Sequence, residues 1–283
     1  MLELIQITPD NAIAFTHLIK EDVYLYVADP ATVSIGITDD KMPVAALLVR
    51  AADDGSSEIL SICVDHEYRR QGLATELLIR AADYLTQDME VNRMNCSFTL
   101  RDGDDSFLGY LKYLEFEINE VPGGCYVTTF GELRQLKELS GPTGSCVPFS
   151  ELTTIQKKQL KDGAMDVSDL LENDSIEPDM SAFLLDGNVI RSCLIFTKDE
   201  EDPDAYTIAW SRNTGSPADM LYLLRYALKA STAADEVKLY VPVLNERSER
   251  LTVGILGDKG RKIETSYEAA LTLLTGDEEQ PVA

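Results

Sequence analysis

The stretch "EILSICVDHEYRRQGLATELLIRAADYL" (residues 58–85) decides the fold of this chain. An apolar, strand-like run is followed by a polar junction, and from Gly72 onward apolar side chains recur at helical spacing. The first N–H groups of such a helix have no intrahelical partner, and the helix dipole adds positive potential there. Gly72 and the small Ala74 let a ligand approach the backbone closely, while Arg69 and Arg70 add positive charge. The junction therefore predicts a binding site for a diphosphate.

The segments around this junction predict a mixed sheet. Further strand-like runs are "LELIQIT" (2–8), "TVSIGIT" (32–38), "PVAALLVRA" (43–51) and "RMNCSFTL" (93–100), and "PDNAIAFTHLIKE" (9–21) is expected to be a helix. Because strands precede and follow one long crossover helix, the sheet should contain a parallel βαβ connection. The predicted fold class is α/β, of the α+β type, with a mixed twisted sheet flanked by helices.

The second half of the chain repeats this pattern. Residues 183–196 read like 37–50, two strands around a polar turn, and 207–227 read like 61–81, a strand leading into an amphipathic helix. Both pairs share one offset, since 183 − 37 and 207 − 61 each equal 146. A common offset without a gap predicts two copies of one fold.

A segment rich in glycine, proline and serine lies between the two copies. This stretch, "LSGPTGSCVP" (139–148), has no periodicity, so it is the predicted linker. The expected domains are therefore residues 1–138 and 149–283.

The second copy lacks the predicted anion site. At the shared offset, Gly215 and Ser216 replace the two arginines, and the bulky Met220 replaces Ala74. We expect a degenerate domain that supports the first, completes an acceptor cleft or forms the surface of a homodimer.

The junction resembles a known family motif. "ICVDHEYRRQGLATELL" (62–78) is similar to the acyl-CoA-binding motif R/Q-x-x-G-x-G/A of the GNAT superfamily of N-acetyltransferases, with Arg69, Gly72 and Ala74 at the defining positions. The resemblance covers residues 1–138 in element order, and the second copy resembles the fold in outline. It implies tandem GNAT-like domains of which the C-terminal copy is degenerate.

The resemblance also implies a ligand and its binding residues. Acetyl-CoA would be the acyl donor, and its pantetheine arm would contact backbone groups of Ile62, Cys63 and Val64. Its pyrophosphate would be held by the backbone N–H groups of Arg69, Arg70, Gln71, Gly72, Leu73, Ala74 and Thr75. An amine would attack the thioester directly.

The proton-transfer residues are implied less directly. Glu58 begins the motif strand, where the family often places a general base, but an exposed strand-edge carboxylate is an equally open reading. In "GYLKYLEF" (109–116) Leu111 stands at the family's tyrosine position. Tyr110 is one residue early and Tyr113 two residues late, and one helical residue turns a side chain by about 100°. We assign the general acid to Tyr110; its alternative role is core packing.

Composition limits the partners. A formal charge of −24 disfavours nucleic acid and suits a cationic acceptor, a small-molecule amine or a peptide amine. Five cysteines without a CxxC pair and only two histidines predict free thiols and no metal site. The sequence shows neither a signal peptide nor a long apolar run. We therefore expect a cytoplasmic location and no association with a membrane. The run "KDEEDPD" (198–204) is expected to be a solvated loop.

Three functions follow from these features. The first is an N-acetyltransferase, and the alternative is a catalytically inactive acyl-CoA-binding or regulatory module, which the shifted tyrosine favours. The third is an interaction protein, which would be favoured if Arg69 and Arg70 were paired with acidic side chains.

Overall fold

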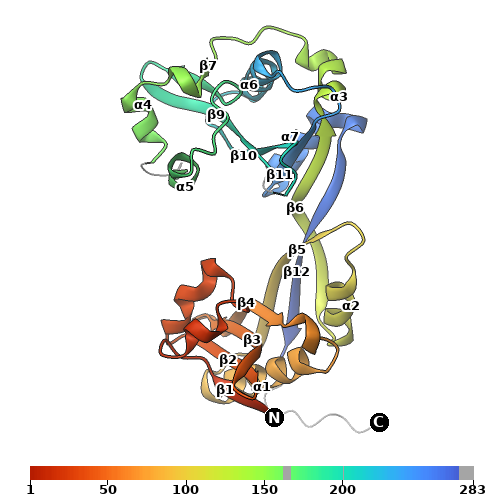
Figure 1. The fold of residues 1–283 in the computed structure, drawn as a ribbon. Coiled ribbons are helices and arrows are strands. Elements are labelled where there is room, and N and C mark those ends of the chain that lie inside the picture. Colours follow the sequence, from red (N-terminus) through yellow and green to blue (C-terminus); the bar gives the residue numbers. More distant parts are fainter. Residues whose placement is uncertain (162–166, 200, 274–283) are drawn as a thin grey trace. The chain divides into compact units, whose positions relative to one another are not determined.

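The computed structural model describes residues 1–161, 167–199 and 201–273 and divides into two compact units (Figure 1). In the described part, unit 1 comprises residues 1–98, 103–121 and 266–273, and unit 2 comprises residues 99–102 together with those from 122 to 265. The chain therefore crosses between the units after residues 98, 102, 121 and 265. Over these residues, no helix combines the length and the hydropathy that a membrane crossing needs.

Unit 1 has the strand order β1-β2-β3-β4-β5-β12-β6. Its elements are β1 (Leu2–Gln6), the 3₁₀ helices η1 (Ala12–Phe15) and η2 (Glu21–Ala28), β2 (Thr32–Asp39), β3 (Met42–Ala51), β4 (Ser56–Val64), η3 (His66–Tyr68), α1 (Leu73–Asp88), β5 (Arg93–Arg101), α2 (Ser106–Tyr113) and parts of β6 (Glu117–Thr129) and β12 (Arg261–Thr272). Strands β4 and β5 pair in parallel across α1, as the sequence predicts.

The prediction of one helix over residues 9–21 is wrong in the length of the helix and in the type of helix. The chain instead forms η1 and then η2, and Lys20 between them has extended backbone angles that end any continuous helix. Phe15 is nevertheless buried, together with Leu18, so the apolar pattern correctly predicts which side chains enter the core.

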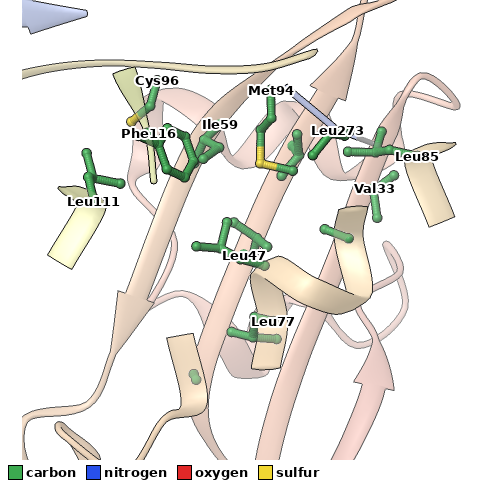
Figure 2. Packing of buried hydrophobic residues seen from close by; sticks show 14 of the residues in the cluster. Val33, Leu47, Ile59, Leu77, Leu85, Met94, Cys96, Leu111, Phe116 and Leu273 are labelled. Atoms are coloured by element: carbon green, nitrogen blue, oxygen red, sulfur yellow. The ribbon is translucent and has the colours of Figure 1, made fainter. Parts of the chain in front are cut away.

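The main core of unit 1 lies between α1 and the sheet. Leu77 and Leu85 of α1 are completely buried against strand residues such as Leu47, as Figure 2 shows. Leu273, which directly follows β12, and Ala269 within β12 belong to the same cluster. The C-terminal strand therefore completes the core of the N-terminal unit.

Unit 2 repeats this arrangement with the strand order β12-β6-β11-β10-β9-β8-β7. Its elements are the remaining parts of β5, β6 and β12, with α3 (Phe130–Gln135), η4 (Lys137–Leu139), β7 (Val147–Pro148), η5 (Phe149–Glu151), α4 (Thr154–Gln159), α5 (Ser168–Glu172), β8 (Ala182–Asp186), β9 (Val189–Lys198), β10 (Tyr206–Asn213), α6 (Pro217–Ala230), β11 (Lys238–Val243), α7 (Glu246–Leu256) and η6 (Gly257–Lys259). The β8–β9 hairpin and the β10–α6–β11 crossover confirm the internal repeat.

The predicted domain boundaries, 1–138 and 149–283 with a linker at 139–148, do not coincide with the division into units. The end of β6 pairs with β11, from Gly124 opposite Val243 to Thr129 opposite Lys238, and so belongs to unit 2. The predicted linker also lies inside unit 2, because the Arg225 guanidinium of α6 donates hydrogen bonds to carbonyl oxygens of Glu138 and Pro142. The sequence repeat spans only the middle of each copy, and it therefore gives no sign that the end of β6 belongs to unit 2.

The position of β12 in unit 1 can be tested by substitution. We expect Ala269→Glu to destabilise unit 1 by about 3 kcal/mol or more, because it buries an unpaired carboxylate. Thr272→Glu, at an exposed position of the same strand, should change stability by at most about 0.5 kcal/mol. Urea unfolding followed by circular dichroism measures both, and equal midpoints for the two variants would contradict the inclusion of β12 in this core.

Candidate functional site

Strands β4 and β5 separate soon after they begin to pair. Only Ser56, Ser57 and Glu58 of the nine residues in β4 have partners in β5. Beyond Glu58 the edge of β4 that faces β5 makes no ladder pairs with that strand, and this part of β4 includes Ile62, Cys63 and Val64. The backbone groups for which the sequence predicts a binding role are thus on a strand that has parted from its neighbour.

Helix α1 begins at this strand end without a side-chain cap. Its N-cap is Gly72 in the left-handed conformation (φ 83°), and the first bond into the helix runs from the Glu76 N–H to the Gly72 carbonyl, 3.0 Å. A Cβ on Gly72 would meet no atom within 4 Å, so the backbone angle, and not crowding, favours glycine here. Helices α3, α4 and α7 each begin with a capping box, whereas α2, α5 and α6, like α1, have no side-chain cap. The start of α1 therefore keeps N–H groups that a ligand could bind.

Two guanidinium groups lie beside these N–H groups. In the described part of the chain, neither Arg69 nor Arg70 forms an ion pair, and Arg69 donates only to the Val64 carbonyl, 3.2 Å. Asp65 does not bind either arginine; it accepts a hydrogen bond from the Glu67 N–H, 3.0 Å. The positive charges are therefore available to an anionic ligand, which removes the condition that would favour a purely structural role.

These groups line one pocket of about 780 Å³ in unit 1. Its walls are Ile62, Cys63, Val64, Tyr68, Arg69, Arg70, Gly72, Leu73, Ala74, Thr75, Ser106, Phe107, Tyr110 and Tyr113. Of the predicted binding residues only Gln71 does not line it, since its side-chain amide donates to the Glu67 carbonyl, 3.3 Å. The sequence reasoning named Tyr110 but missed Tyr68, Ser106 and Phe107, although the i, i+3 spacing of Phe107 and Tyr110 could have revealed the shared face of α2.

Tyr110 and not its neighbour Leu111 faces this pocket. Leu111, at the family's tyrosine position, is 1% exposed and belongs to the core of unit 1. Tyr110 is half-buried, and its hydroxyl lies 3.4 Å from the Thr75 Oγ1. Burial raises the pKa of Tyr110, and the contact with Thr75 opposes part of this increase. Tyr113 is 79% exposed.

Glu58 lies in a different pocket, of about 250 Å³. Arg93 and Asn95 also line it, and on β5 they flank Met94, which belongs to the core under α1. Because successive side chains of a strand point to opposite faces, Glu58 and the α1 pocket are on opposite sides of the sheet of unit 1. The two predicted proton-transfer residues are therefore not brought into one pocket.

The equivalent helix start in unit 2 carries its own anion. Asp219, in the first turn of α6, is 4% exposed and accepts hydrogen bonds from Arg191 Nε (3.1 Å), Ser192 Oγ (3.2 Å) and Ser216 Oγ (3.3 Å). A Cβ on Gly215 would lie 2.1 Å from a carboxylate oxygen of Asp219. The second copy has therefore filled the position at which the first copy leaves room for a ligand.

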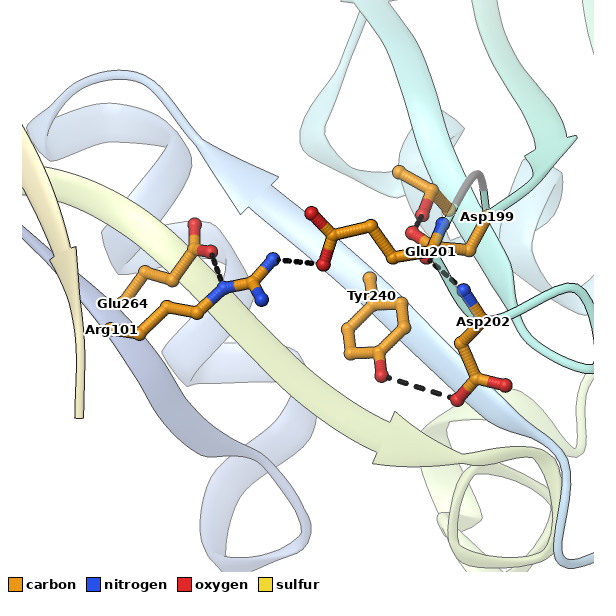
Figure 3. A network of polar contacts seen from close by, with 7 residues as sticks. Arg101, Asp199, Glu201, Asp202, Tyr240 and Glu264 are labelled. Carbon is orange, nitrogen blue, oxygen red and sulfur yellow. Dashed lines mark hydrogen bonds and ion pairs between the residues drawn. The ribbon is translucent and has the colours of Figure 1, made fainter. Parts of the chain in front are cut away.

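Unit 2 also has a polar pocket of about 530 Å³, whose side chains are mostly paired (Figure 3). Arg101 donates to Glu201 (2.6 Å) and Glu264 (3.1 Å), which raises the pKa of Arg101. Lys238 binds Asp202 at 2.8 Å and lowers the pKa of that carboxyl. Residues 199 and 201–204, after the end of β9 at Lys198, are thus partly exposed and also anchored by the ion pairs of Glu201 and Asp202, and these contacts give the pocket a structural role.

The described residues contain no cluster of His, Cys, Asp and Glu that could hold a metal ion. All five cysteines are free thiols, and Cys96, Cys125 and Cys193 are buried.

Comparisons with known proteins identify the fold. Residues 4–107 match the acetyltransferase (GNAT) family, and no curated protein matches the chain. A tandem GNAT protein from the clavulanic acid biosynthesis pathway is 12% identical, with a TM-score of 0.57 over 98% of this chain and 100% of its own. Two further structures have the same fold. A conserved protein from Enterococcus faecalis V583 is 10% identical, with a TM-score of 0.52 over 97% of this chain and 73% of its own.

The second of these structures is a GCN5-related N-acetyltransferase from Kribbella flavida. It is 12% identical, with a TM-score of 0.51 over 96% of this chain and 71% of its own. Residues 4–107 are therefore similar to an acetyltransferase (GNAT) domain, and the chain as a whole has a fold similar to that of a tandem GNAT protein.

Proposed function

We propose that this protein is an acyl-CoA-dependent N-acyltransferase that moves an acetyl group from acetyl-CoA directly to an amine. The observation that carries the proposal is the uncapped start of α1 beside Arg69 and Arg70, in a pocket of about 780 Å³. Backbone N–H groups at a helix start, together with guanidinium groups, are the donors that a diphosphate prefers. Coenzyme A combines a diphosphate with a long thiol arm that can follow the free edge of β4.

The two faces of the sheet suggest how the substrates meet. The donor would occupy the pocket under α1 and α2, and the amine would approach from the pocket that contains Glu58. Both pockets meet β4 near the point where it separates from β5, so the reacting atoms could come together through this gap. Such an arrangement favours direct transfer, and a covalent acyl-protein intermediate is not needed.

Two side chains would move the protons. Tyr110 is the proposed general acid, which gives its proton to the departing thiolate. Glu58 is the proposed base, which accepts a proton from the acceptor ammonium, directly or through water, so that the neutral amine can attack the thioester. The net charge of −24 would attract a cationic acceptor, either a small-molecule amine or a peptide amine. We also propose a cytoplasmic location, in keeping with the free thiols.

Acetyl-CoA binding tests the first step. Gly72→Glu should weaken binding at least about a hundredfold, because a carboxylate beside the diphosphate repels it and a side chain is strained at this backbone angle. Gly103→Glu is the matched control, since Gly103 is also left-handed (φ 89°), a Cβ there would meet open space, and the residue does not line the pocket. Calorimetry measures both variants, and equal affinities would contradict the proposed donor site.

Tyr110 can be tested against its neighbour on α2. Tyr110→Phe should lower kcat by about a hundredfold, whereas Tyr113→Phe should have little effect. Since burial raises the pKa of Tyr110 above its ordinary value of about 10, the rate should persist through neutral pH and fall only on the strongly alkaline side. Thiol release over an amine panel measures these rates, and an unchanged rate for Tyr110→Phe would reject the assignment.

Glu58 requires a separate experiment. Glu58→Gln should lower kcat by about a hundredfold and leave acetyl-CoA binding intact, because this side chain is outside the donor pocket. Glu67→Gln removes an exposed carboxylate from the same unit and serves as the control. If both variants keep the full rate, Glu58 is only a strand carboxylate.

An inactive acyl-CoA-binding module is the alternative function. It is favoured by the displacement of the tyrosine to position 110 from the family's usual place, now filled by the buried Leu111. Tight acetyl-CoA binding without thiol release for any amine would support this alternative.

A further inference from the structure

The hydroxyl of Tyr110 has one polar partner. Thr75 Oγ1 lies 3.4 Å from it, and among the described residues no other hydrogen bond reaches this hydroxyl. Thr75 is in the first turn of α1, whereas Tyr110 is in the middle of α2. The contact therefore links the helix start that would bind the diphosphate to the side chain that would protonate the thiolate.

The other groups around the Tyr110 ring are apolar side chains, or charged side chains that, in the described part of the chain, form no hydrogen bond with it. The Phe107 ring, one turn earlier on α2, lies with its centroid 6.4 Å away. The charged side chains on the walls of the same pocket are Arg69 and Arg70, and neither contributes to the shift of the Tyr110 pKa. The phenols of Tyr68 and Tyr113 are the other tyrosines on these walls. Thr75 is therefore the group that can set the direction of the Tyr110 hydroxyl.

We propose that Thr75 is a positioning residue that holds the Tyr110 hydroxyl toward the donor sulfur; this inference rests on the proposed acyltransferase function. Leu111 is buried in the core, so the tyrosine must act from a position rotated by about 100° around α2. A hydrogen bond from the facing helix would compensate for this rotation by selecting the rotamer that faces the pocket.

The contact also suits the proton transfer. In the resting state the Thr75 hydroxyl accepts the phenol proton or donates its own, and a long hydrogen bond can shorten once substrate is bound. When the Tyr110 O–H bond breaks and an S–H bond forms on the thiolate, Thr75 can donate to the resulting phenolate. Tyr110 then regains its proton from water. A hydrogen bond to the phenolate is stronger than one to the neutral phenol, so Thr75 stabilises the charged form without taking part in the exchange of protons.

Removal of the hydroxyl tests this role. Thr75→Val keeps the shape of the side chain and the backbone N–H, and it should lower kcat about tenfold, the effect of one hydrogen bond, with acetyl-CoA affinity nearly unchanged. Thr75→Ser keeps the hydroxyl and should retain most of the rate. In a Tyr110→Phe background, Thr75→Val should have no additional effect.

An optical titration separates this inference from the proposed function. The ultraviolet absorbance of tyrosinate, taken as the difference from Tyr110→Phe, should show a higher pKa for Tyr110 in Thr75→Val than in the native chain, even if no amine is acetylated. An unchanged pKa would overturn the inference, as would a Thr75→Val variant with full activity or one that loses acetyl-CoA binding instead of kcat. Absence of turnover in the native chain, with the pKa difference present, would reject only the enzymatic function.

Discussion

The proposed function depends on one unsatisfied constraint, the start of a long helix whose first N–H groups have no side-chain cap. Gly72 turns the chain into α1 without providing one, and the two arginines nearby have no carboxylate partner among the described residues. Everything else in unit 1 positions this helix start. The core under α1 fixes the helix on the sheet, and the separation of β4 from β5 opens the backbone edge beside it. An anion with several oxygens is the ligand that would satisfy these groups together.

The equivalent helix of unit 2 also lacks a side-chain cap, but an anionic side chain occupies its start. This long helix, α6, also follows a strand, and the buried carboxylate of Asp219 lies at the helix start and is bound by Arg191 and two serine hydroxyls. A carboxylate near a helix N-terminus stabilises the dipole, so α6 needs no ligand. The contrast within one chain indicates that the open start of α1 is a feature of the first copy and not of the fold in general.

Much of this could be predicted from the sequence, because hydrophobic periodicity and the junction around Gly72 are local signals. They predicted the crossover helix, the repeated scaffold and most of the residues that line the pocket beside the start of α1. Three features were beyond local reasoning. The exchange of strands that places β12 in unit 1 depends on pairing between distant segments, and the separation of Glu58 from the donor pocket depends on which face each strand residue occupies. The contact between Thr75 and Tyr110 joins two residues of different helices that lie 35 positions apart in the sequence.

The most direct measurement of the central claim is the response of the backbone amides of Leu73, Ala74 and Thr75 in nitrogen-15 nuclear magnetic resonance spectra. If the start of α1 binds the diphosphate, these signals shift strongly with coenzyme A and remain in place with pantetheine, which lacks the diphosphate. Signals that shift equally with both compounds, or that do not move with coenzyme A, would contradict the account.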